Sequence, residues 1–154
     1  CALNETLQQK DELTVYVLGD QEVAEELLIF KNQRVGFAQL KTITYGTTVP
    51  SVKPDVLLVC DPSKVEEAVE YCRENAVFSI TNTTKACKQG ISTAIVSKMP
   101  ITFQHFYSMT SVYATVNKSS LFAEGMSLSE QVYKVAKPIE DDQIKDELAY
   151  FQIY

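Results

Sequence analysis

The sequence predicts an α/β fold with a mostly parallel central sheet, and three observations lead to it. The chain has 154 residues, which fits one domain and is too short for two full ones. Short β-branched and aromatic runs alternate with segments of helical periodicity. Residues 55–60 are almost continuously apolar, as in a central parallel strand that is buried on both faces. We therefore expect a single Rossmann-like domain over residues 1–154, with helices on both faces of the sheet.

The first half of the chain contains two strand-helix units. Residues 13–18 form a predicted strand that stops at a Gly-Asp turn, and residues 21–30 follow as a helix. Residues 37–45 are a weaker strand candidate, and residues 46–54 are a predicted loop. After the apolar strand described above, a second helix is predicted to begin at Pro62-Ser63. The residues at helical spacing are Val23, Leu27 and Phe30 in the first helix, and Val65, Ala68, Val69 and Cys72 in the second.

The same alternation continues to residue 97. Residues 77–81 form a predicted strand, and Asn82-Thr83-Thr84 is a helix-start signal followed by a stop at Gly90. Residues 91–97 are another strand candidate. Beyond Pro100 the pattern changes, because residues 101–107 and 112–117 are both typical of strands, with few helical signals around them.

A helix is expected near the end of the chain. Ser127 is predicted to cap it and to form a capping box with Glu130, and Pro138 ends it after Lys137. Its core-facing residues are Leu128, Val132 and Val135. Residues 13–137 would then be the core of the domain, and residues 139–154 a C-terminal helical extension that places Ile144, Leu148 and Phe151 on one face.

Charge and hydropathy restrict the partners. The net charge is −6 and the few basic residues are scattered, so the chain lacks the basic surface that neutralises phosphates in nucleic acids. No apolar run approaches the ~20 residues that cross a bilayer, so the chain itself is not expected to insert into a membrane. The printed chain begins at Cys1, which allows a lipoprotein anchor. The helical character of the residues that follow argues against that anchor.

The residues that usually carry catalysis are sparse. The only histidine, His105, lies in an aromatic run, and the chain contains no nucleophile elbow, P-loop or HExxH motif. Cys60, Cys72 and Cys87 lack the spacing of zinc ligands, and their disulfide pairing, with or without Cys1, stays open. We therefore expect a protein that is not an enzyme and that uses no metal or other cofactor.

Ligand-binding candidates lie at the predicted carboxyl ends of the strands. Gly19 and Asp20 follow the first strand, Asp61 follows the apolar strand, and Asn82 follows the next one. Ligands of open α/β sheets collect at this edge. The competing interpretation is that the two aspartates only form turns and cap helices, which is a common role for Asp.

Two alternative functions use the same edge. A response-regulator receiver needs acidic residues, a phosphoacceptor Asp, a Ser or Thr and a Lys in chain order, and Asp20, Asp61, Thr81 and Lys98 occur in that order. The first strand ends in Gly-Asp and not in an acidic pair, so a bound cation would lack one carboxylate. The other alternative is a small-ligand-binding periplasmic domain.

Three stretches resemble the YfiR family of periplasmic regulators, and together they extend over residues 14–137. Thr14 to Asp20 is similar to the opening strand and Gly-Asp turn of that family, and Pro54 to Cys60 is similar to its central strand. The third stretch, from Tyr113 to Lys137, resembles its closing strand, its Asn helix start and its terminal helix. The chain departs from the family in having no tryptophan near its start and in its long aromatic segment after Met99.

The resemblance implies an extracytoplasmic, secreted regulator that represses a membrane-bound sensor or signalling protein, such as a diguanylate cyclase, by binding to it. It also implies a homodimer. For the partner interface, Phe103, Phe106 and Tyr107 are the candidates, because buried aromatic residues often anchor protein interfaces. Packing in the core is the competing role for these three residues.

Overall fold

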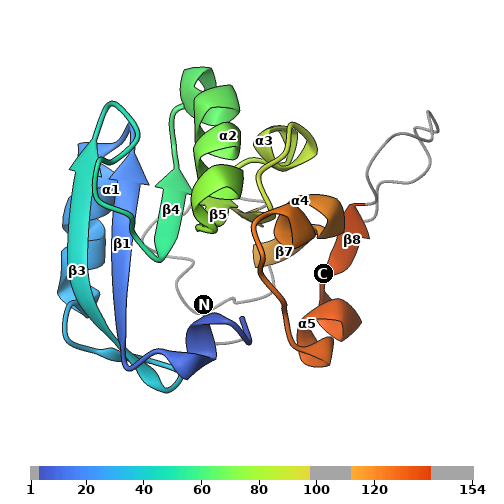
Figure 1. The fold of residues 1–154 in the computed structure, drawn as a ribbon, viewed down its shortest axis with the longest axis horizontal. Helices are drawn as coiled ribbons and strands as arrows, with labels where there is room; N and C mark the ends of the chain where they lie inside the picture. The colour runs from blue at the N-terminus through green and yellow to red at the C-terminus, as the bar shows by residue number, and fades with distance from the viewer. Residues whose placement is uncertain (1–3, 98–111, 140–154) are drawn as a thin grey trace.

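The computed structural model describes residues 4–97 and 112–139 and has an α/β architecture (Figure 1). The described strands form one mixed, eight-stranded sheet in the order β2-β3-β1-β4-β5-β6-β7-β8. The strands are β1 (Glu12–Leu18), β2 (Arg34–Val35), β3 (Ala38–Gly46), β4 (Val56–Val59), β5 (Phe78–Thr81), β6 (Thr93–Ser97), β7 (Val112–Asn117) and β8 (Lys137–Ile139). The predicted mostly parallel sheet is confirmed, because β3, β1, β4, β5 and β6 are mutually parallel.

The outer parts of the sheet depart from this parallel arrangement. At one end β2 pairs antiparallel with β3, and at the other β7 pairs antiparallel with β6. β8 then runs parallel to β7. The predicted strand over residues 101–107 lies outside the described residues. So does the predicted helical extension over 139–154, except for Ile139, which belongs to β8 and not to a helix.

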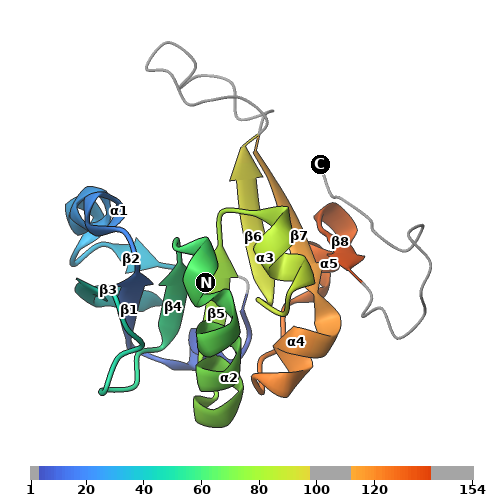
Figure 2. The ribbon, with the colours of Figure 1, turned by 90° about the horizontal axis from the view of Figure 1, so that it is seen from above.

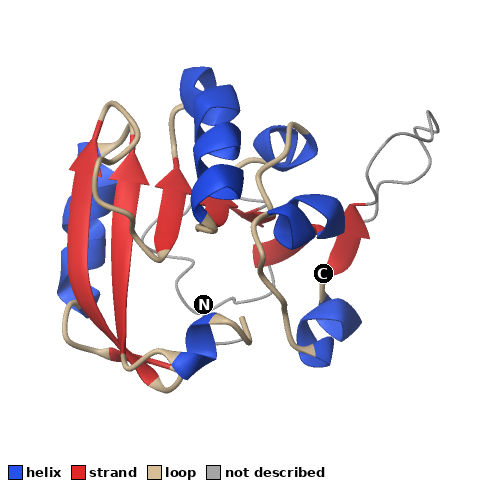
Figure 3. Cartoon of the chain, in the orientation of Figure 1, coloured by secondary structure: helices blue, strands red, loops and turns tan. Residues whose placement is uncertain are grey.

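Short helices connect and flank the strands (Figure 3). The α-helices are α1 (Gln21–Leu27), α2 (Val65–Asn75), α3 (Thr84–Lys88), α4 (Lys118–Ala123) and α5 (Glu130–Val135). The 3₁₀ helices are η1 (Leu7–Gln9), η2 (Leu28–Phe30) and η3 (Pro62–Lys64). All these helices except α2 have at most seven residues, a length that is marginal in isolation, so packing on the sheet must hold them.

The central strands bury both faces, as the apolar run at residues 55–60 predicts. Within β4, Val56 packs into one apolar cluster, while Leu57 and Val59 pack into another, as the alternation of a strand requires. The first cluster includes side chains of η1 and α5, and the second includes those of α2 and α3. Figure 2 shows α1 and α2 on opposite sides of the strands.

The predicted helix over residues 21–30 is only partly correct. The α-helix ends at Leu27, and the chain continues as the 3₁₀ helix η2. In the predicted apolar face, Val23 and Leu27 are only half-buried and Phe30 is exposed, whereas Ala24 is the buried residue of α1. The short strand β2 then returns along β3, and this strand has no counterpart in the prediction.

The predicted cap of the last helix is wrong. Ser129, not Ser127, is the N-cap residue of α5, and it makes no side-chain capping bond. The Ser127 hydroxyl lies 3.1 Å from Glu5 Oε2, to which it donates a hydrogen bond. The predicted burial of Leu128 and Val132 is confirmed. The helix ends at Val135 and residues 137–139 form β8, where the prediction continues the helix to Lys137.

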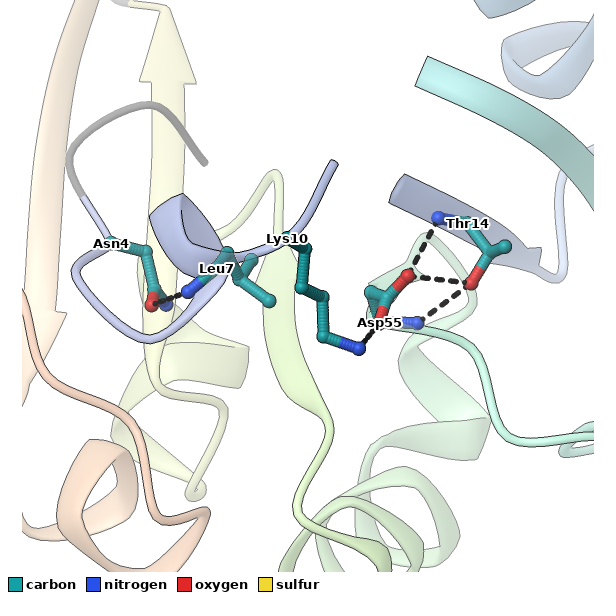
Figure 4. Close-up of polar contacts among 5 residues, drawn as sticks. All are labelled: Asn4, Leu7, Lys10, Thr14 and Asp55. Atoms are coloured by element: carbon teal, nitrogen blue, oxygen red, sulfur yellow. Dashed lines mark hydrogen bonds and ion pairs between the residues drawn. The ribbon is translucent and has the colours of Figure 1, made fainter. Parts of the chain in front are cut away.

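The amino ends of β1 and β4 are tied together by a polar cluster (Figure 4). The Asp55 carboxylate accepts hydrogen bonds from the Thr14 backbone N–H (2.8 Å) and hydroxyl (2.9 Å), and it pairs with the Lys10 ammonium. The Asp55 N–H donates in turn to Thr14 Oγ1 at 3.0 Å. This reciprocal pairing fixes β1 against β4 at the edge of the sheet opposite to the predicted ligand site.

Candidate functional site at the carboxyl edge of the sheet

The strand order places a topological switch point between β1 and β4. The chain passes from β1 to β3 on one side, whereas from β4 it passes to β5 on the other side. In open α/β sheets, ligands bind in the crevice outside the carboxyl ends of the strands at such a point. Gly19, Asp20 and Asp61 follow β1 and β4 directly, so the structure brings three of the four predicted ligand-binding residues to this position.

The crevice at this switch point is closed by close packing. Gly19 has a φ of 94°, and a Cβ atom added to it would lie 2.3 Å from the Cβ of Asp61. The backbone N–H groups of Cys60 and Asp61 both donate to the Leu18 carbonyl, at 3.0 and 3.3 Å. The end of β4 therefore packs directly on the turn after β1 and leaves no gap for a ligand between them.

Both predicted aspartates cap helices. The Asp20 carboxylate accepts a hydrogen bond from the Val23 N–H at 3.1 Å and so caps α1. The Asp61 carboxylate accepts from the N–H and the hydroxyl of Ser63, at 2.8 and 2.7 Å, and caps η3. These bonds from Ser63 hold the pKa of Asp61 below its usual value. The competing interpretation from the sequence, in which these residues form turns and caps, thus accounts for both side chains.

Cys60 lies between these aspartates and is a poor nucleophile. Burial raises the pKa of its thiol to about 11, and the Asp20 carboxylate adds to the shift. The thiolate is the reactive form of cysteine, so Cys60 stays almost fully protonated at neutral pH. Cys60, Cys72 and Cys87 are all free thiols in the described structure.

Asn82 lies beside a small pocket at the ends of β4 and β5. The pocket has about 150 Å³ of empty space, part of it open to solvent, and its walls include Cys60, Asp61, Thr81 and Thr83. Drug-sized ligands need ≈ 300–1,000 Å³, so this pocket is too small for them. Thr83 is committed to capping α3, because its hydroxyl oxygen accepts from the Ala86 N–H at 3.2 Å.

Several predicted functional residues lie outside the described part of the chain. These are the interface candidates Phe103, Phe106 and Tyr107, the histidine His105, Lys98 of the receiver alternative, and Cys1. Within residues 4–97 and 112–139, no group of three or more His, Cys, Asp or Glu side chains is placed to hold a metal ion. In the same residues, no helix is long and apolar enough to span a bilayer.

The structure shows two features that the sequence analysis missed. The first is a set of four exposed large apolar side chains, Leu28, Ile29, Phe30 and Phe37, on the segment from η2 to the turn after β2, which we call the η2–β2 surface. The sequence analysis missed this surface because helical spacing places Phe30 on the predicted core face of a helix over residues 21–30. In the structure that α-helix ends at Leu27, before Phe30. The second is Glu124, a carboxyl group that is only 1% exposed and lies at the end of α4.

No protein-family model matches the chain, and no curated protein matches it in sequence. The resemblance to the YfiR family therefore stays a prediction from the residues quoted above.

Proposed function

We propose that this chain is a regulatory binding module of the YfiR type, a single Rossmann-like domain that works outside the cytoplasm and is not an enzyme. In this proposal it represses a membrane signalling protein, such as a diguanylate cyclase, by binding its extracytoplasmic sensory part. Such regulation needs only different affinities for two states of the partner, and no bond is made or broken. The chain would act as a homodimer, as the resemblance implies.

The observation that carries this proposal is the η2–β2 surface. Ile29 is 70% exposed and Phe37 is 77% exposed, and both lie within ten residues of Leu28 and Phe30 at the β2 end of the sheet. Single exposed apolar residues are common, but four large ones within ten residues of one segment favour a surface that another protein covers. The cluster includes two phenylalanines, and aromatic residues are enriched at the centres of protein interfaces.

Charges beside this surface indicate the chemistry of the partner. Lys31 and Arg34 belong to the same segment, and both are exposed in a chain whose net charge is −6. A partner surface with apolar residues bordered by Asp or Glu would complement them, and such pairs would accelerate association and fix its orientation.

The carboxyl edge of the sheet supports binding of a protein over binding of a small ligand. Asp20, Asp61 and Thr83 are committed to helix caps, and the crevice at the switch point is filled by the contact of Gly19 with Asp61. A small-ligand domain would need this edge open.

Binding to solubilised membranes of the source organism tests the proposal. The wild-type chain, an Ile29→Glu/Phe37→Glu variant and a Phe122→Glu control would each be used as bait. Phe122 is 85% exposed on α4, outside the η2–β2 surface, so the control removes an exposed aromatic residue elsewhere. We expect wild type and control to retain the same membrane protein with an extracytoplasmic sensory domain, and the double variant to lose it.

A titration with the purified sensory domain would then measure the affinity. The double variant replaces Ile29 and Phe37, which the partner would bury. We expect it to weaken binding by roughly 10²-fold or more, because hot-spot residues each contribute ≥ 2 kcal/mol. Retention of the partner by the double variant would reject the η2–β2 surface. Failure of the wild-type chain to bind any such protein would reject the function itself.

A further inference from the structure

Glu124 lies beside a stretch of the sheet where the strands β5 and β6 lack backbone hydrogen bonds to each other. β5 and β6 pair only at Ile80 with Thr93 and at Thr81 with Ala94. One residue earlier, the Ser79 N–H donates to Glu124 Oε2 at 3.1 Å, and the Ser79 carbonyl accepts from the Ser92 hydroxyl at 2.8 Å. The carboxyl group of α4 and the hydroxyl of Ser92 thus replace the missing ladder bonds between the two strands.

The protons in this cluster can be counted. Three oxygen–oxygen contacts each require one hydroxyl proton: Glu124 Oε1 with Ser79 Oγ, Ser79 Oγ with Ser92 Oγ (3.3 Å), and Ser92 Oγ with the Ser79 carbonyl. The two serines supply two protons. The third must come from the carboxyl group, so all three hydrogen bonds form together only when Glu124 is a neutral acid.

The neutral form also satisfies every atom of the cluster. Ser79 Oγ accepts from the Glu124 O–H and from the Ser92 N–H (2.8 Å), and it donates to Ser92 Oγ. Ser92 Oγ accepts that bond and donates to the Ser79 carbonyl. If Glu124 ionises, the single Ser79 proton has two acceptors, and one of the two contacts loses its hydrogen bond.

The surroundings offer little compensation for a charge on Glu124. Among the described residues, Arg73 of α2 is the cation that acts on Glu124, and the Arg73 guanidinium donates a hydrogen bond to Ser120 Oγ at 3.3 Å. The other titratable groups coupled to Glu124 are the thiols of Cys72 on α2 and Cys87 on α3, both buried. Burial is the largest cause that raises the pKa of Glu124, to about 7, and it outweighs the hydrogen bonds from Ser79 and Ser92 and the charge of Arg73.

We propose that Glu124 is a proton-operated latch: its protonated carboxyl group joins α4 to β5 and to the segment that enters β6, and loss of the proton loosens this junction. The latch goes beyond the function proposed above, because it does not depend on which partner the module binds. It makes the packing of α4 against the sheet sensitive to pH near neutrality.

The sign of the effect follows from linkage. Between pH 4.5 and about 7 the folded chain keeps a proton that the unfolded chain releases. The stability contributed by the proton is therefore complete below pH 4.5 and falls as pH rises through this range. Relative to a variant without the titration, the unfolding constant of the wild type should rise on the order of 10²-fold between pH 5 and pH 8.

Urea unfolding at a series of pH values, for wild type and Glu124→Gln, is the test. Glutamine keeps one acceptor and one donor in place but cannot ionise, so it should remove the pH-dependent difference. Glu130→Gln, which changes an exposed glutamate on α5, is the matched control and should follow the wild type. Parallel pH profiles of wild type and Glu124→Gln would overturn the proposal.

Infrared spectroscopy gives a second measurement that does not depend on stability. A protonated carboxyl band should be present in the wild type at pH 6, be absent in Glu124→Gln, and disappear from the wild type by pH 8. An ionised Glu124 in the wild type at pH 6 would overturn the latch even if the glutamine variant folds poorly.

Discussion

At the scale of single residues, the contact of Gly19 with Asp61 decides whether the switch point is open or closed. A side chain at Gly19 meets two obstacles: a φ of 94° and a Cβ contact of 2.3 Å with the β-carbon of Asp61. The second obstacle is the one that fills the crevice. The cost of the positive φ can be measured apart from the cost of the Cβ contact, because Gly125 has only the first. Its φ is 69°, and a Cβ atom added to it would lie 4.0 Å from its nearest neighbour.

Gly19→Ala is therefore expected to lower the free energy of unfolding by about 3 kcal/mol, from backbone strain and overpacking together. Gly125→Ala should lower it by about 1 kcal/mol, from strain alone. Urea unfolding of both variants measures the difference. Equal losses would show that Asp61 yields easily and that the crevice can open.

Asp55 contributes stability that depends on pH with the opposite sign to Glu124. Burial by itself raises the pKa of Asp55, but the hydrogen bonds from Lys10 and Thr14 outweigh it and hold the pKa below its usual value. The contribution is present at neutral pH and is lost as pH falls through the carboxyl range.

Asp55→Ala should cost about 1–3 kcal/mol at pH 7, because it leaves the half-buried Thr14 groups without their acceptor. The cost should shrink below pH 4, where the wild type loses the same interaction. Glu12→Gln is the control: its pair with Lys41 is exposed on both sides, so its loss should stay within about 0.5 kcal/mol. A cost for Asp55→Ala that is constant down to pH 3 would contradict this account.

At the scale of elements, side-chain caps from the residue just before the helix hold several of the short helices. Asn117 ends β7 and caps α4, since its Oδ1 accepts from the Ser120 N–H at 3.0 Å. Its amide also donates to the Cys87 carbonyl at 3.1 Å and so joins α4 to the end of α3. The hydroxyl of the predicted cap Ser127 caps no helix and makes an exposed hydrogen bond to Glu5 Oε2.

Asn117→Ala should therefore lower stability by about 1–2 kcal/mol, from the lost cap and the lost bond to the Cys87 carbonyl, which keeps its hydrogen bond from the Gly90 N–H. Ser127→Ala should change it by less than about 0.5 kcal/mol. Thermal or urea unfolding distinguishes the two variants. A larger loss of stability in Ser127→Ala than in Asn117→Ala would instead support the predicted capping box of Ser127 and Glu130.

At the scale of the whole molecule, the buried thiols report on global opening. Burial raises the pKa of Cys87 to about 12 and also raises that of Cys72, and both residues are fully buried in the packing of α2 and α3 on the sheet. These thiols can react only when that packing opens.

In a Cys1→Ser variant, a thiol reagent at pH 7.5 should label Cys72 and Cys87 only as fast as the domain unfolds. Cys60 is half-exposed and should react slowly but without unfolding. Mass spectrometry of the labelled peptides, with and without urea, checks this order. Rapid labelling of Cys72 in the native protein would contradict the described core.

The sequence by itself determined the parallel centre of this protein and the roles of its strands. An apolar run such as residues 55–60 suits a strand buried on both faces, and Gly-Asp after β1 and Thr83 before α3 are local signals for turns and caps. These features are set by neighbouring residues, and the structure agrees with them. The predicted positions of Gly19, Asp20, Asp61 and Asn82 after their strands are confirmed for the same reason, whereas a ligand-binding role for them stays a prediction.

Only the tertiary structure decided which surfaces are open and which polar groups are buried. No local pattern shows that Asp61 packs on Gly19, that α1 ends early enough to expose Ile29 and Phe30, or that Glu124 lies beside Ser79, 45 positions away. Helical periodicity describes one element, whereas these contacts join residues that are distant in the chain. Burial and proton affinity depend on such contacts, so the features behind both proposals could be read only from the folded molecule.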